Sequence, residues 1–88
     1  MAKFMSTHTV PPGTFTTDQI QQFAEAAQHD STVKGYRSFA NLEEGKVVCI
    51  MEAADNDAVE AWFKKMGMPF DSITKVELEG DRGSVQPV

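Results

Sequence analysis

The sequence contains a single cysteine, Cys49, and fewer basic than acidic residues, 8 against 13. One thiol excludes an internal disulfide and suits the reducing cytoplasm. The formal net charge of −5 argues against a nucleic-acid partner, which would need a basic surface. No apolar run approaches the roughly 20 residues that cross a bilayer, and the amino terminus lacks the apolar core of a signal peptide. We therefore expect an acidic cytoplasmic protein with no nucleic-acid or membrane partner.

Two helix signals and four strand patterns divide the chain. Thr16 and Gln19 have the spacing of a capping box, and apolar residues then recur at helical spacing to about residue 29. A second helix is predicted from about Asp55 to Met66, with Gly67 ending it. Segments rich in β-branched and aromatic residues predict strands over residues 3–10, 33–42, 46–53 and 72–79.

The order β-α-β-β-α-β predicts an α+β fold, the ferredoxin-like sandwich. In that fold an antiparallel sheet carries both helices on one face, and its first and third strands lie in the centre. The chain of 88 residues has room for one domain, which we place at residues 1–80, followed by a polar tail at residues 81–88.

Side chains alternate along each strand, which sorts the residues between the two faces of the sheet. If Asn41 lies opposite Lys46, the helix-facing residues are Met5, Ser38, Ala40, Val47, Cys49 and Met51. The other face then carries Phe4, Ser6, His8, Arg37, Phe39, Val48, Ile50 and Glu52. An uncovered face with this many apolar side chains indicates contact with another subunit. We predict a homodimer through this face, closed as a dimeric α+β barrel with a pocket between the sheets.

The candidate ligand-binding residues on that face are Arg37, Glu52, Phe39 and Ser6. Arg37 would anchor an anion and Glu52 would orient it, while a structural ion pair between the two is the alternative. Cys49 is expected to be a core thiol, since no histidine is predicted on its face. His8 is predicted roughly 13–17 Å from Glu52, at about 3.3 Å per residue. These two could share a metal ion only if His8 came from the second subunit.

Four short segments resemble a known family: FMSTH (residues 4–8), CIMEA (49–53), AV (58–59) and GMPFDSITKV (67–76). Together they resemble the small bacterial nickel-binding family of ferredoxin-like proteins, formerly a domain of unknown function, of which this chain would be a divergent member. The resemblance implies the ferredoxin-like fold, nickel as the cofactor, and His8 as a metal ligand. The family often has histidines where Thr9 and Phe63 stand here. Because nickel prefers imidazole and thiolate, we expect the metal site to be replaced or lost.

Three classes of function stay open, because a fold does not decide a function. The first, which we favour, is a dimeric binding protein that holds a metal ion such as nickel, or a small ligand, between its sheets. The second is a cofactor-free isomerase or oxygenase of the dimeric α+β barrel type. There His8 would be the general base, since an ordinary pKa of about 6.5 suits proton transfer near neutrality. The third is a structural dimer without a ligand.

Overall fold

The predicted order of helices and strands is present, with two short strands added at its end. The computed structural model describes residues 1–88. The elements are β1 Ala2–Thr9, α1 Thr17–His29, β2 Val33–Asn41, β3 Lys46–Ala53, α2 Asn56–Lys65, β4 Ser72–Lys75, β5 Leu78–Asp81 and β6 Ser84–Pro87. Neither helix has the length and hydrophobicity needed to pass through a membrane.

Short sequence signals set the helix ends where they are predicted. The Thr16 hydroxyl accepts from the amide of Gln19 at 3.2 Å, and the Gln19 side chain accepts from the amide of Thr16 at 2.9 Å, which completes the capping box. At the start of α2 the Asp55 carboxylate accepts from the amide of Ala58 at 2.9 Å. Gly67, with a φ of 70°, follows the last turn of α2.

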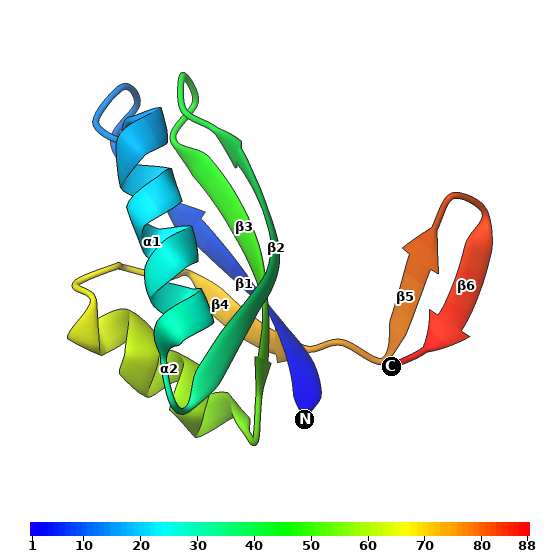
Figure 1. Ribbon diagram of the computed structural model, residues 1–88. Helices are drawn as coiled ribbons and strands as arrows, with labels where there is room; N and C mark the ends of the chain where they lie inside the picture. Colours follow the sequence, from blue (N-terminus) through cyan, green and yellow to red (C-terminus); the bar gives the residue numbers. More distant parts are fainter.

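The main sheet has four antiparallel strands in the order β2-β3-β1-β4, which confirms the ferredoxin-like sandwich. Asn41 pairs with Lys46, so the predicted hairpin register is also confirmed. Figure 1 shows both helices on one side of this sheet and only the β5–β6 hairpin on the other. We call the side without helices the open face.

The register of β1 corrects one part of the sequence prediction. The pairs with β3 are Phe4–Met51, Ser6–Cys49 and His8–Val47. Because paired residues share a face of the sheet, Phe4, Ser6 and His8 point toward the helices, where they are 5%, 0% and 1% exposed. Their placement on the open face was wrong, as was the placement of Met5 beneath the helices, since Met5 is 38% exposed. The large Phe4 ring gains more from burial than Met5, and the two polar residues satisfy their hydrogen bonds inside.

The turn between β2 and β3 closes against the chain that follows β1. The amide of Val10 donates to the carbonyl of Gly45 at 2.8 Å. Gly45 has a φ of 72°, and a Cβ at this position would lie 2.0 Å from the carbonyl oxygen of Val10. Only glycine therefore fits at position 45, for reasons of both backbone conformation and space.

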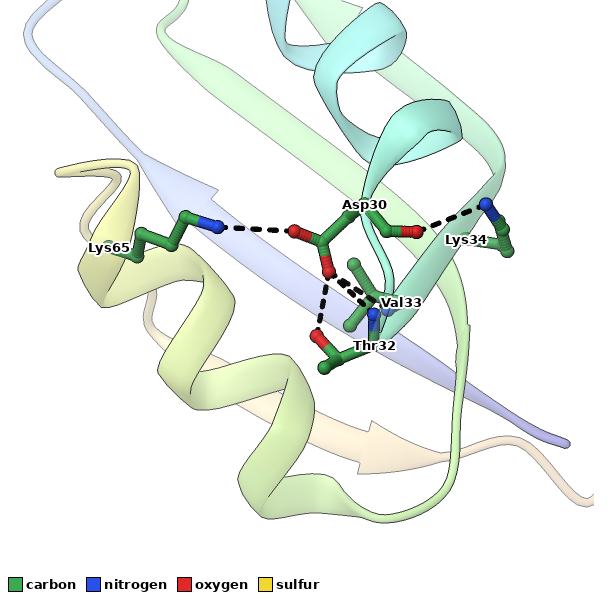
Figure 2. Close-up of polar contacts among 5 residues, drawn as sticks. All are labelled: Asp30, Thr32, Val33, Lys34 and Lys65. Atoms are coloured by element: carbon green, nitrogen blue, oxygen red, sulfur yellow. Dashed lines mark hydrogen bonds and ion pairs between the residues drawn. The ribbon is translucent and has the colours of Figure 1, made fainter.

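Asp30 joins the end of α1 to β2 and to α2, as Figure 2 shows. One carboxylate oxygen accepts from the amide and hydroxyl of Thr32 at 2.8 and 2.7 Å and from the amide of Val33 at 3.2 Å. The other oxygen accepts from Lys65 Nζ at 3.2 Å, and the Asp30 carbonyl accepts from Lys34 Nζ at 3.0 Å. These bonds, with those from Thr32 the strongest, hold the pKa of Asp30 well below its usual range.

The last predicted strand, residues 72–79, is divided in two. β4 ends at Lys75, and the chain continues into the β5–β6 hairpin, which includes most of the segment expected as a polar tail. Arg82 and Gly83 have φ values of 52° and 87°, as a two-residue turn of type I′ requires. The hairpin stands away from the main sheet, on the side opposite the helices (Figure 1).

Candidate functional site

A chain of hydrogen bonds lies buried between β1 and α2. His8 Nδ1 lies 2.7 Å from the carbonyl oxygen of Pro69, and His8 Nε2 lies 2.8 Å from Ser6 Oγ. The Phe63 ring of α2 packs edge-on against the imidazole, with the centroids 4.6 Å apart. Ser6 and His8 reach the same place because they are two residues apart on one strand. Each buried polar side chain here has a partner.

The partners of His8 determine its tautomer. A carbonyl oxygen can only accept, so Nδ1 carries the proton and donates to Pro69, and Nε2 accepts from the Ser6 hydroxyl. Burial lowers the pKa of His8, and this outweighs the opposing effects of the Pro69 carbonyl and the Asp71 charge. His8 is therefore neutral near pH 7, and neither ring nitrogen is free.

Cys49 faces the helices, as predicted, and lies opposite Ser6 in the sheet. The expectation that no histidine shares its face was wrong, because His8 does. Burial raises the pKa of Cys49, and the neighbouring Ser6 side chain opposes this shift only in part. The thiol is protonated at neutral pH, and it is therefore a weak nucleophile and a weak metal ligand.

Next to these residues a cavity of about 280 Å³ lies between α1, α2 and the β2–β3 part of the sheet. Its lining is mostly apolar and consists of Ile20, Phe23, Ala24, Ala27, Gln28, Gly35, Tyr36, Arg37, Ser38, Val47, Cys49, Met51, Trp62, Phe63 and Met68. Ser6 and His8 are not part of this lining. Arg37 is the one lining residue that is charged at neutral pH.

The backbone of β2 shapes one wall of the cavity. A β-bulge between Gly35 and Arg37 shifts the register against β3, so that Gly35 pairs with Met51 and Arg37 with Ile50. A Cβ on Gly35 would lie 3.1 Å from the Cβ of Ala27, which shows how closely α1 approaches β2 at this point. The absence of a side chain at position 35 lets the helix and the strand meet beside the cavity.

The cavity can hold a small apolar molecule. A dry cavity of about 150 Å³ is enough to bind benzene, so the volume here admits a molecule roughly twice that size. An apolar lining with few polar groups is typical of small-molecule sites. Ser38 and the Cys49 thiol supply hydrogen-bonding groups within the lining. Because His8 lies outside the cavity, no general base faces its contents.

The candidate site residues named from the sequence lie on two different faces of the sheet. Ser6 and His8 are buried under the helices, whereas Phe39 is 61% exposed on the open face. Arg37 borders the cavity next to the bulge, but its pairing with Ile50 assigns it to the strand pattern of the open face. The pocket expected between two sheets is therefore not formed by these residues together within one protomer.

The expected ion pair between Arg37 and Glu52 is absent. Glu52 lies opposite Lys34 on β2, and Arg37 lies opposite Ile50. The ion pairs of the protomer include neither Arg37 nor Glu52. The bulge leaves the pairing of Arg37 unchanged and brings Lys34 opposite Glu52, where an unbroken register would place Gly35.

The side chains of one protomer do not fit a nickel site. No three His, Cys, Asp or Glu residues converge on a common point. His8 uses both ring nitrogens in hydrogen bonds, and Cys49 holds its proton. A second subunit on the open face could not receive His8 as a shared ligand, because His8 points toward the helices. The donors that nickel prefers are therefore not available in this arrangement.

The cavity walls include residues that the sequence assigns to the helix core. The apolar stripes at helical spacing contain Ile20 and Phe23 in α1 and Trp62 and Phe63 in α2, and all four line the cavity. The stripe is the signal that identifies these residues. It does not show that the two helices leave a space between them and the sheet.

Comparison with known proteins gives a family and a structural relative. Residues 4–76 match the sequence model of a protein family that is described as "Nickel responsive protein SCO4226-like". The crystal structure of SCO4226 from Streptomyces coelicolor A3(2) is similar over 90% of this chain and 100% of that chain, with a TM-score of 0.75 and 28% sequence identity. Comparison with curated proteins gives no match.

Proposed function

Because the chain belongs to the nickel responsive SCO4226-like family but its own donors do not fit a nickel site, we propose that it binds a small apolar organic molecule. The ligand would occupy the cavity between α1, α2 and the sheet. The cavity of about 280 Å³ is the single observation that carries this proposal. Its lining and size suit a compact aromatic or aliphatic compound without a net charge.

The state of the polar groups near the cavity supports binding rather than reaction. Cys49 is a protonated thiol, and the imidazole of His8 is engaged with Ser6 and Pro69. A cofactor-free enzyme would need a base within hydrogen-bond reach of its substrate. We therefore assign the protein a binding role, and we place it in the cytoplasm on the basis of its free cysteine.

Nickel is the competing ligand, because the family to which the chain belongs is described as nickel responsive. A nickel ion bound by His8 and Cys49 would have to displace the hydrogen bonds of the imidazole and the thiol proton. Native mass spectrometry of the metal-stripped protein with added Ni²⁺ tests this directly. A fixed number of bound ions that is lost in His8→Ala would replace the organic ligand with nickel in this proposal.

We also propose that the open face joins two copies of the chain. Phe39 and Met5 are 61% and 38% exposed there, and Val48 and Ile50 lie between them, half-buried. A contiguous apolar surface of this kind is unusual on a monomer and is typical of a subunit interface. The same native mass spectra report the subunit number. A monomer at micromolar concentrations would contradict the dimer and leave the cavity proposal unaffected.

Trp62, the sole tryptophan of the chain, lines the cavity and reports on its contents. We would titrate the protein with 4-bromobenzyl alcohol, because bromine quenches indole fluorescence on contact. We expect saturable quenching in the natural protein. Ala24→Phe, which places a ring in the cavity wall, should abolish the saturable component.

Ala61→Phe is the matched control, because Ala61 is exposed on α2 and does not line the cavity. The tryptophan fluorescence of this variant should show the same saturable quenching as that of the natural protein. Quenching that rises linearly and equally in all three proteins would show collisional quenching without binding and would overturn the cavity proposal.

A further inference from the structure

The β5–β6 hairpin lies beyond the part of the chain that matches the family. The match ends at residue 76, and β5 begins at Leu78. Figure 1 shows the hairpin standing apart from the main sheet, next to the side opposite the helices. A two-stranded hairpin is marginally stable on its own in water, so this one needs a surface to pack against.

The two faces of the hairpin differ sharply in polarity. Leu78 pairs with Pro87 and Gly80 with Val85, so these four residues share one face, which is apolar. The other face is polar and consists of Glu79, Asp81, Ser84 and Gln86. Leu78 and Val85 are 62% and 65% exposed. The apolar face is thus uncovered within the protomer, in the pattern of a strand pair that is half-buried by something else.

The polar face holds the hairpin to its own protomer. Glu79 accepts from Lys3 Nζ at 2.7 Å and from the Tyr36 hydroxyl. Lys3 Nζ also lies 3.6 Å from the centroid of the Tyr36 ring. Since Glu79 belongs to the face opposite Leu78 and Val85, these contacts turn the apolar face away from the hairpin's own sheet. The protomer cannot cover that face without breaking the bonds of Glu79.

We infer that the hairpin is an arm whose apolar face packs on the open face of a second copy of this chain, around Phe39. The inference rests on the proposed dimer. Phe39 is 61% exposed on the edge strand β2, where an arm from a neighbour can reach it. Leu78 and Val85 supply the apolar surface that this ring lacks.

Charge supports a second copy as the occupant. Arg37 and Lys46, near Phe39 on the open face, form no ion pair within the protomer. The segment that leads into the arm brings Glu77, which is exposed and forms no ion pair. An acidic side chain at the base of the arm therefore meets a basic part of the sheet, although the chain as a whole carries a net charge of −5. A closed dimer would cover both apolar surfaces in each protomer.

Disulfide trapping between differently tagged chains tests this arrangement. Both chains carry Cys49→Ala, one carries Val85→Cys, and the other carries Phe39→Cys. Under mild oxidation the mixture should give a mixed covalent dimer in several-fold higher yield than Val85→Cys mixed with Gln22→Cys. Gln22 is the control position, because it is exposed on α1, on the other side of the sheet.

The possible outcomes distinguish a failure of the arm proposal from a failure of the dimer proposal. If native mass spectrometry shows a dimer but the Phe39→Cys yield only equals that of Gln22→Cys, the arm is overturned and the proposed dimer stands. If the two cysteines link only when they are in one chain, the hairpin packs on its own sheet and the inference is overturned. If the natural chain is monomeric, both the arm and the dimer are overturned.

Discussion

The hydroxyl oxygen of Ser6 lies 2.8 Å from Nε2 of His8, and both residues are almost completely buried. The pair lets a central strand carry two polar side chains into the core, because the two side chains hydrogen-bond each other. The Pro69 carbonyl accepts the hydrogen bond from the Nδ1–H of the imidazole. The cost of burying these groups is offset only while the imidazole is neutral.

Stability should therefore depend on the protonation of His8. Its pKa is lowered in the folded state, so its contribution is complete above the unfolded pKa of about 6.5 and is lost as the pH falls through the lower folded value. We expect the free energy of unfolding in urea to fall from pH 7 to pH 5. His8→Gln should cost about 1–3 kcal/mol at pH 7.5 and should flatten this fall.

His29→Gln is the control for that titration, since His29 is exposed at the end of α1. Its pH profile should follow that of the natural protein. An unchanged slope in His8→Gln would show that the imidazole is not the group that titrates.

The reactivity of Cys49 should report the balance between its burial and its contact with Ser6. Burial raises the pKa of Cys49, whereas the nearby Ser6 hydroxyl favours the thiolate and lowers it, so Ser6→Ala should raise the pKa further. Alkylation by iodoacetamide, followed against pH, should show a midpoint above that of the unfolded chain, and a still higher one in Ser6→Ala. Ser38→Ala, another change within the cavity lining, should leave the midpoint in place. A native midpoint at or below that of the unfolded chain would contradict this account.

Gly45→Ala should destabilise the fold by about 2–4 kcal/mol, because it combines a positive φ with a backbone clash. The added Cβ would meet the carbonyl oxygen of Val10, which cannot move without losing the contact between β1 and the hairpin turn. Gly83→Ala is matched to it: φ is 87° there, but nothing lies within 4 Å. That change should cost about 1 kcal/mol, from backbone strain alone. If Gly45→Ala and Gly83→Ala lower the melting temperature equally, the clash with Val10 is not the cause of the destabilisation.

Asp30→Asn should lower the melting temperature at pH 7, because it weakens the link from α1 to Lys65 and to the start of β2. The pKa of Asp30 is lowered in the folded state, so its carboxylate stabilises the fold above the unfolded value of about 3.9. That contribution is lost progressively as the pH falls below this value. The difference between natural protein and variant should therefore shrink in melts below about pH 4. Glu43→Gln, in the exposed turn after β2, should show no comparable difference at either pH.

The sequence was sufficient for the fold where local signals and global topology agree. The capping box at Thr16, the glycines after the β2 strand and α2, and the β-α-β-β-α-β order all led to the observed sheet. β1 was different, because a strand of mixed residues satisfies a two-residue period with either face inward. The polar Ser6 and His8 looked like surface residues, and only the distant carbonyl of Pro69 makes their burial possible.

The candidate site was less accessible to sequence reasoning than the fold. The bulge at Gly35 carries no unique sequence mark, yet it brings Lys34 rather than Gly35 opposite Glu52. The cavity depends on how far α1 and α2 stand from the sheet, and an apolar stripe gives only the direction of a helix face. The hairpin after β4 was missed because its strands are only four residues long and the second is polar at alternate positions.

The position of β1 between β3 and β4 has a consequence for the order in which the protein forms. Ser6 pairs with Cys49 on one side and with Ile73 on the other, so β1 is made well before either of its neighbours. During synthesis α1 and the local β2–β3 hairpin can form early, whereas the first strand waits without hydrogen-bond partners. β1 joins β3 before β4 can be added at its other edge, so both late steps close long loops, and the rate of folding is set by closing them.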